Sequence, residues 1–212
     1  MTIERPITLP PQWAESLLQL FLSAADRDSI SGDLLEEFRE SIVPALGAGA
    51  NRWYVRQVAW YVLRATAPWG ALVAAIGVTR YLFDTLAPIH YTPGVIALRS
   101  TVMTRALMAT FALCGCWQAW CTGWWHAGVV AAFAAAVLGG VLEIIGTAML
   151  LTVRHDPSTM AAIHGSGGIG ELWAIPLILQ PLAGTITGIA GAAVGRAAAA
   201  IYGASRPNTN TA

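Results

Sequence analysis

The hydrophobic and the charged residues of this chain occupy different parts of the sequence. Residues 1–64 carry 14 of the 24 charged side chains, and the 148 residues that follow carry 10. No charged residue lies between Arg105 and Glu143, or between Glu171 and Arg196. Each helix that crosses a bilayer needs about 20 mostly apolar residues, whereas a water-exposed surface needs polar cover. The pattern therefore predicts an all-α integral membrane protein, with a small N-terminal helical module (residues 1–64) followed by a four-helix transmembrane bundle (residues 65–195).

Four apolar stretches are the predicted membrane spans. They cover about residues 66–83, 102–122, 128–153 and 172–195, and a short turn at Trp124-Trp125-His126 joins the second span to the third. Residues 196–212 are basic and then polar, so we expect a disordered tail. The arginine-rich flank before the first span favours an inside N-terminus, and with four spans both termini are then cytoplasmic.

The spacing of apolar residues predicts three helices in the N-terminal module. The first starts near Pro11, the second starts at Asp28 or Ser29, and the third starts near Asn51 after a loop at residues 44–50. The second helix has an apolar stripe made of Ile30, Leu34, Phe38 and Ile42. Its other face is acidic, and we expect this face to dock a partner protein. The acidic residues are Asp33, Glu36, Glu37 and Glu40.

Arginine and tryptophan cluster where the predicted module meets the predicted membrane. At such an interface, indole rings lie among the lipid headgroups and guanidinium groups meet phosphates. The interface residues that we predict are Arg52, Trp53, Arg56, Trp60, Trp124 and Trp125. The alternatives are a plain basic helix face, and contact of the tryptophans with a pigment, a quinone or a lipid.

Part of the module resembles a known family. Gly32-Asp33-Leu34-Leu35-Glu36-Glu37-Phe38 and Trp53-Tyr54-Val55-Arg56-Gln57 are similar to the permease prefix region, which precedes bacterial ABC-transporter permeases of the macrolide-exporter type. The resemblance covers about residues 10–64, and it implies a bacterial inner (cytoplasmic) membrane and an association with transporters. The rest of the chain departs from that family. The loop at residues 84–101 is too short for the family's extracytoplasmic domain, and no P-loop sequence is present.

One acidic residue interrupts the apolar sequence of the third span. Glu143 lies near the middle of that span, and helical geometry puts small residues on its face, so we expect Glu143 to face protein. Counting from the turns places other polar residues at a similar depth or in the same outer half. We predict one intramembrane polar layer of Arg80, Arg105, Glu143 and Gln180. It either fixes helix register through a buried Arg105–Glu143 pair or relays protons or ions.

Glycines spaced along the third and fourth spans predict close helix packing. Small residues let helix backbones approach within a membrane. The predicted packing residues are Gly139, Gly140, Gly146, Gly184, Gly188, Gly191 and Gly195. Because the fourth span has two such glycine faces, they suit both packing inside the bundle and the binding of a partner chain.

Composition and motifs argue against several functions. The chain is 56% hydrophobic and has a formal net charge of zero, so we expect no nucleic-acid partner. Cys114, Cys116 and Cys121 lack the paired spacing of a metal site, and most histidines fall in the outer loops at irregular spacing. No catalytic triad or nucleotide loop stands out. We therefore expect no metal, no cofactor and no enzymatic activity.

These features lead to three hypotheses about function. The first is a non-enzymatic accessory or scaffold subunit of a bacterial membrane protein complex. Its partners would be membrane lipids and either other membrane subunits or further copies of itself. The second is a small proton- or ion-coupled transporter that uses Glu143 and Arg105. The third is a subunit of an energy-converting complex that contacts lipid, quinone or pigment. We favour the first, because the resemblance to the permease prefix region implies it. Against the second, we detect no internal repeat of the kind that transporters carry.

Overall fold

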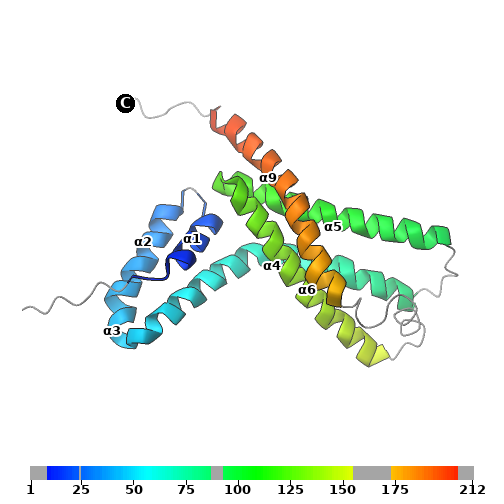
Figure 1. Cartoon of the computed structure of the whole chain (residues 1–212), viewed down its shortest axis with the longest axis horizontal. Coiled ribbons are helices and arrows are strands. Elements are labelled where there is room, and N and C mark those ends of the chain that lie inside the picture. The colour runs from blue at the N-terminus through cyan, green and yellow to red at the C-terminus, as the bar shows by residue number, and fades with distance from the viewer. Residues whose placement is uncertain (1–8, 24, 87–92, 155–172, 205–212) are drawn as a thin grey trace, which may run out of the picture.

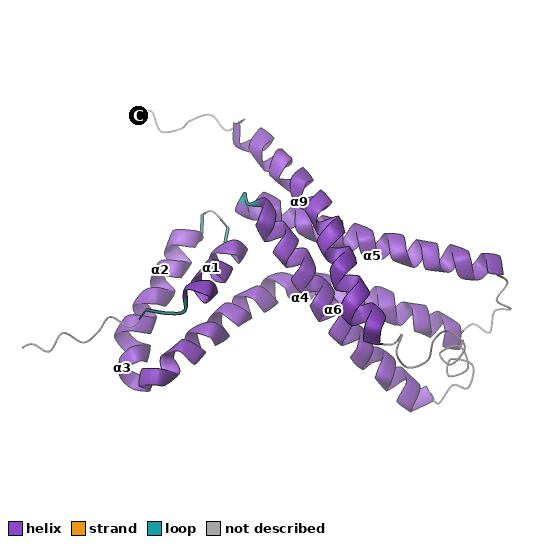
Figure 2. Ribbon diagram, in the orientation of Figure 1, coloured by secondary structure: helices purple, strands orange, loops and turns teal. Residues whose placement is uncertain are grey.

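The computed structural model describes residues 9–23, 25–86, 93–154 and 173–204. All regular structure in these ranges is helical, as Figure 2 shows, which confirms the predicted all-α class. The short helices α1 to α3 lie together on one side, and the long helices α4, α5, α6 and α9 pack against one another (Figure 1).

The N-terminal module is built from short helical segments. α1 covers Gln12–Phe21 and α2 covers Arg27–Glu37. A π-helical turn at Phe38–Ile42, α3 at Val43–Leu46 and a 3₁₀ turn at Gly47–Gly49 then lead directly into α4. The prediction of a loop at residues 44–50 is therefore wrong. Two glycines suggested a break, but Gly47 takes a positive φ of 51° and reverses the chain between two helical turns.

The core of the module forms where α1, α2 and α4 meet. Leu18, Leu34, Phe38 and Tyr54 are buried together, and the rings of Phe38 and Tyr54 meet edge to face with their centroids 5.4 Å apart. The stripe predicted on the second helix thus faces this core through Leu34 and Phe38.

Helix α4 joins the module to the rest of the chain without interruption. It runs over Ala50–Leu86, so the predicted third helix and the predicted first span are one helix of 37 residues. Pro68 lies inside it and leaves the carbonyl of Arg64 without its helical donor. Figure 1 shows α4 changing direction midway along its length, and we attribute this bend to Pro68.

Helices α5 and α6 form an antiparallel hairpin. α5 covers Pro93–Thr122 and α6 covers Trp125–Arg154. Gly123 ends α5 with a φ of 74°, a left-handed conformation that glycine adopts readily, and its N–H donates to the carbonyl of Ala119. α5 starts nine residues before the predicted span, because Pro93 suits the first position of a helix and Arg99 and Ser100 do not end one.

The last helix is longer than predicted. A π-helical turn at Ile175–Leu179 precedes α9, which covers Gln180–Ala204 and contacts both α5 and α6. Residues 196–204, predicted to belong to a disordered tail, are helical because their alanine-rich sequence continues the helix.

Three helical stretches are long and apolar enough to cross a membrane. They are Arg27–Thr79, Trp125–Val153 and Ile175–Tyr202. α5 has sufficient length but is not among them. Its Arg99, Arg105 and Gln118 lower its mean hydropathy.

Candidate functional site

The strongest candidate for a functional group inside the long helices is the carboxyl group of Glu143. Glu143 lies on α6 and is only 6% exposed. The side-chain amide of Gln180, at the start of α9, donates a hydrogen bond from Nε2 to Oε2 of Glu143 at 2.5 Å. Gln180 is itself 5% exposed. The structure thus brings together two of the four residues predicted to form a polar layer.

A glycine on α4 makes room for this carboxyl group. A Cβ atom added at Gly77 would collide with the Glu143 carboxylate, so only glycine lets the α4 backbone pass so close. Gly139 and Gly146 lie on α6, one turn on either side of Glu143, and they pack against Val73 and Val78 of α4. Our sequence interpretation missed Gly77, although a single glycine among bulkier residues of an apolar helix is a signal of close packing.

Two buried oxygen atoms near Glu143 have no hydrogen-bond partner among the described residues. They are Oγ1 of Thr147 and Oε1 of Gln180. Other buried threonines, Thr66, Thr110 and Thr122, donate to the carbonyl four residues earlier at 2.8 Å. The Thr147 hydroxyl makes no such bond, so two oxygen atoms beside Glu143 could still accept or donate a hydrogen bond.

The helix that carries Gln180 is irregular at this point. The π-helical turn ends at Leu179, directly before Gln180, and Pro176 and Pro181 flank the amide. The carbonyl oxygen of Pro176 lies so close to Gly140 that a Cβ atom there could not fit. π-helical turns are frequent at functional sites, because they reorient side chains within a helix.

Of the two arginines predicted for the layer, only Arg105 can be placed relative to this arrangement. The side chain of Arg80 lies outside the described residues. Arg105 is exposed on α5, so the expected buried Arg105–Glu143 pair is not formed. Counting residues from a turn gives depth along a helix, but it does not give the direction of the side chain around the helix axis.

The glycines of α9 pack inside the chain. Gly184 and Gly188 lie against Ala136 and Ala132 of α6. Gly191 and Gly195 lie against the backbone carbonyls of Ala112 and Cys116 of α5. Both glycine faces are therefore already covered, and neither is available to a partner chain, because α9 packs between α5 and α6.

The acidic face of the module is open. All four of its residues, on α2 and on the π-helical turn that follows it, are exposed, while Leu34 and Phe38 on the other side of this continuous stretch are buried. These four residues are Asp33, Glu36, Glu37 and Glu40.

The predicted interface residues are also mostly exposed. Arg52, Arg56, Trp60 and Trp125 are exposed, and Trp53 is half-buried. Trp124 has a specific contact, because the guanidinium of Arg27 lies over its ring at 4.2 Å from the centroid.

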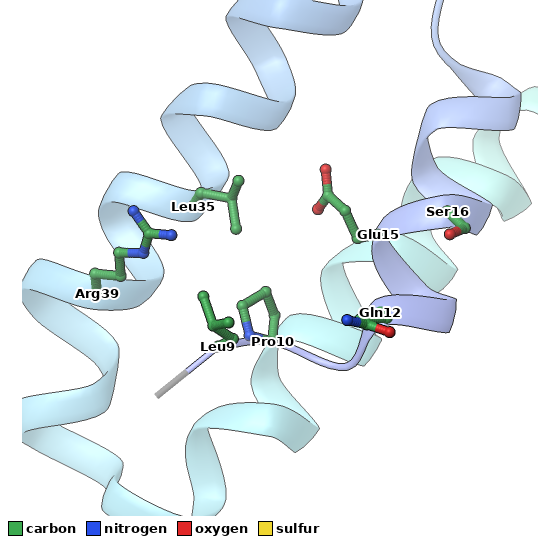
Figure 3. Close-up of a pocket in the computed structure, with 7 residues that line it drawn as sticks. All are labelled: Leu9, Pro10, Gln12, Glu15, Ser16, Leu35 and Arg39. Atoms are coloured by element: carbon green, nitrogen blue, oxygen red, sulfur yellow. The ribbon is translucent and has the colours of Figure 1, made fainter. Parts of the chain in front are cut away.

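A pocket of about 350 Å³ opens beside α1 in the module. Figure 3 shows Leu35 and Arg39 on one wall and Gln12, Glu15 and Ser16 on the other. Leu9 and Pro10 complete the lining. Because the pocket is open to the surroundings, we assign it no ligand.

Glu15 is the hydrogen-bonding centre of the module. Its carboxylate accepts hydrogen bonds from the hydroxyls of Ser31 and Tyr54 and from the amide of Gln19. Burial raises the pKa of Tyr54 above its ordinary value, and the hydrogen bond to the negatively charged Glu15 raises this pKa further. These groups hold α1, α2 and α4 together, a role that the sequence interpretation missed.

In the part of the chain that the structure describes, no three His, Cys, Asp or Glu residues lie close enough to hold a metal ion. Comparison with known protein families, with curated proteins and with solved structures finds no match to this chain. Within the residues that the structure describes, the fold is all-helical, and three of its helical stretches are long and apolar enough to cross a membrane.

Proposed function

We propose that this chain is a non-enzymatic accessory or scaffold subunit of a bacterial membrane protein complex, set in the inner membrane by four spanning helices with both termini in the cytoplasm. In line with the resemblance of residues 10–64 to the permease prefix region, we propose that the complex is associated with a transporter.

The observation that carries this proposal is the open acidic face of α2 on a module that is anchored to the long helices. On the anchored side, the Gln118 amide donates to the carbonyls of Leu20 and Phe21, each at 3.4 Å. Arg27 donates to the carbonyl of Thr122 at 3.4 Å. The acidic residues on α2 are exposed. An exposed, negatively charged surface suits docking of a basic partner surface, because complementary charge steers association.

The test is to extract the protein from its native membrane under mild conditions and to record native mass spectra together with an absorbance scan. An accessory subunit leaves the membrane as part of a stoichiometric complex. Glu37→Lys should release the partner, while Asp28→Lys, an equal charge change at an exposed site outside the acidic face, should not. A wild-type chain recovered alone would contradict the proposal, and co-purifying absorbance would favour a pigment- or quinone-binding subunit.

A second candidate function rests on the surroundings of Glu143. A buried carboxyl group beside a π-helical turn and two unused oxygen atoms is an arrangement that a small proton- or ion-coupled transporter would need. Glu143→Gln keeps the shape of the side chain and its bond to Gln180 while removing the charge. If the polar layer has only a structural role, this variant should fold and assemble like the wild type. Loss of gradient-dependent flux in proteoliposomes by a normally assembled Glu143→Gln protein would instead favour transport.

A further inference from the structure

One face of α5 is apolar and exposed but carries an arginine near its middle. The exposed residues of this face recur at helical spacing along the whole helix, and we refer to them as the α5 stripe. They are Val95, Leu98, Val102, Arg105, Ala109, Leu113 and Trp120.

Most of the α5 stripe, from Val95 to Leu113, points away from the other long helices. Leu107, two residues after Arg105, packs against Val73, Phe111 and Ala136 in the core. Residues two apart on a helix point about 200° apart, so Arg105 is directed to nearly the opposite side. On the inward side of α5, Gly115 lies against the backbone of Gly188. At one end of the stripe, Trp120 stacks on Tyr202 of α9, with the ring centroids 5.5 Å apart. The part of the stripe from Val95 to Leu113 is therefore the part open to a partner.

In the four-span arrangement proposed above, α5 is one of the spans, and the position of Arg105 along it then lies inside the membrane. Arg105 is 15 residues from Trp120, which corresponds to about 22 Å along a helix. The hydrocarbon core of a bilayer is about 30 Å thick. If Trp120 lies at one interface, the guanidinium group of Arg105 lies within this hydrocarbon core. Arginine facing lipid there is costly, so such residues usually face a partner or a polar cavity.

A second copy of this chain is a poor partner for Arg105. Between Asp84 and Asp156 the sequence has one acidic residue, Glu143. Glu143 is buried and bonded to Gln180, so it is not available on the outer surface of another copy. The glycine faces of α9 are also covered within the chain. Residues 93–154 therefore offer no second acidic group to Arg105, and a different molecule can supply the compensating charge.

We propose that the α5 stripe binds a membrane-spanning helix of another protein, and that this helix carries an Asp or Glu side chain that pairs with Arg105. The inference rests on the accessory role proposed above and names how the partner is recognised within the membrane. Apolar residues on either side of Arg105 give contact area, and the single ion pair sets the register of the two helices.

The experiment places a photo-crosslinking residue at Ala109 on the stripe, and in a separate variant at Glu37 on the acidic face, in the full chain in its native membrane. Crosslinking at Ala109 to a protein whose spanning segment contains an acidic residue is the expected result. Crosslinking at Glu37 but only lipid at Ala109 would overturn this inference and leave the accessory role standing. No protein crosslinked at either position would overturn both.

Charge variants then test the ion pair itself. Arg105→Gln should lower the crosslinked yield at Ala109 about tenfold, while the neighbouring exposed variant Thr104→Ala should leave it unchanged. Arg105→Glu combined with Arg in place of the partner's acidic residue should restore the yield. An undiminished yield with Arg105→Gln would overturn the proposal. A second result would also overturn it. If Arg105→Gln makes the isolated protein less stable only in nanodiscs of anionic lipid, Arg105 is bound to lipid headgroups and not to a partner helix.

Discussion

At the scale of single residues, two carboxyl groups connect distant parts of this chain through side-chain hydrogen bonds. Glu15 in the module accepts hydrogen bonds from three side chains, one each on α1, α2 and α4. Glu143 among the long helices is bonded to Gln180 and has Gly77 opposite. Each carboxyl group therefore links elements that are far apart in the sequence, and its loss should weaken the packing of those elements.

The buried phenol of Tyr54 leads to a prediction about pH. Its pKa is raised in the folded protein above the value near 10 expected in the unfolded chain. The folded state therefore keeps the neutral phenol at a pH where the unfolded chain ionises. The stabilisation is fully present below about pH 10 and decreases as the pH rises above it.

The measurement is the unfolding temperature of the wild type and of Tyr54→Phe, followed by circular dichroism across this pH range. Below about pH 10 the wild type should be more stable by about 1–2 kcal/mol, because it keeps the hydrogen bond to Glu15. Above this pH the difference should shrink. A difference that does not change with pH would show that the phenol is not held neutral by the fold.

At the scale of elements, the long helices approach one another through glycines. Gly191 and Gly195 on α9 lie against the backbone of α5, and Gly128 on α6 lies close to Gly115 on the same helix α5. Dispersion contacts between backbones replace side-chain packing here. This matters in a membrane, where lipid tails are as apolar as the side chains and burial gives little driving force.

Gly191→Ala should therefore destabilise the protein. The added Cβ would lie 2.7 Å from the carbonyl carbon of Ala112, and the backbone of α5 cannot yield without moving the helix. We expect a loss of about 1–3 kcal/mol, which corresponds to a fall of about 2–10 °C in the unfolding temperature.

The matched control for this substitution is Gly32→Ala on α2. A Cβ atom at Gly32 would have no neighbour within 4 Å, so this variant should be neutral or about 0.5–1 kcal/mol more stable. Equal effects of the two substitutions would mean that helix propensity, and not the close approach of α5 and α9, decides the result.

At the scale of the whole molecule, α4 connects the module to the long helices, and a joint elsewhere also holds the module against them. The joint is formed by the end of α1 and the start of α2, which contact the turn between α5 and α6. Phe21 is buried there with Cys114, Ala131 and Ala135. The guanidinium of Arg27 lies over Trp124, so one cation–π contact supplements the apolar surface.

Arg27→Ala should loosen this joint without unfolding the long helices. A cation–π contact contributes about 0.5–2 kcal/mol, so hydrogen exchange at the α1–α2 joint should rise by about twofold to thirtyfold. Exchange in α6 and α9 should stay the same. Arg39→Ala, which removes an exposed arginine from the same module, is the control. Unchanged exchange at the joint would mean that the apolar contacts of Phe21 alone hold the module in place.

The sequence by itself determined which parts of the chain are helical and apolar, because both properties follow from local composition and spacing. The stretches that became α4, α6 and α9, the acidic face of α2 and the burial of Glu143 could all be predicted in this way. Helix ends could not be placed as well. Arg99, and the arginine and alanines after Gly195, looked like flanking sequence, yet they continue helices that extend beyond the apolar stretch.

The tertiary structure alone decided which side chains meet. Residue counts gave Arg105 and Glu143 a similar depth, but the rotation of α5 turns Arg105 outward, and only the packed helices set that rotation. Gly77 opposite Glu143, the contact of Arg27 with Trp124, and the use of both α9 glycine faces within the chain were decided in the same way. Each depends on which helix lies beside which, and this arrangement results from packing between residues that are distant in the sequence.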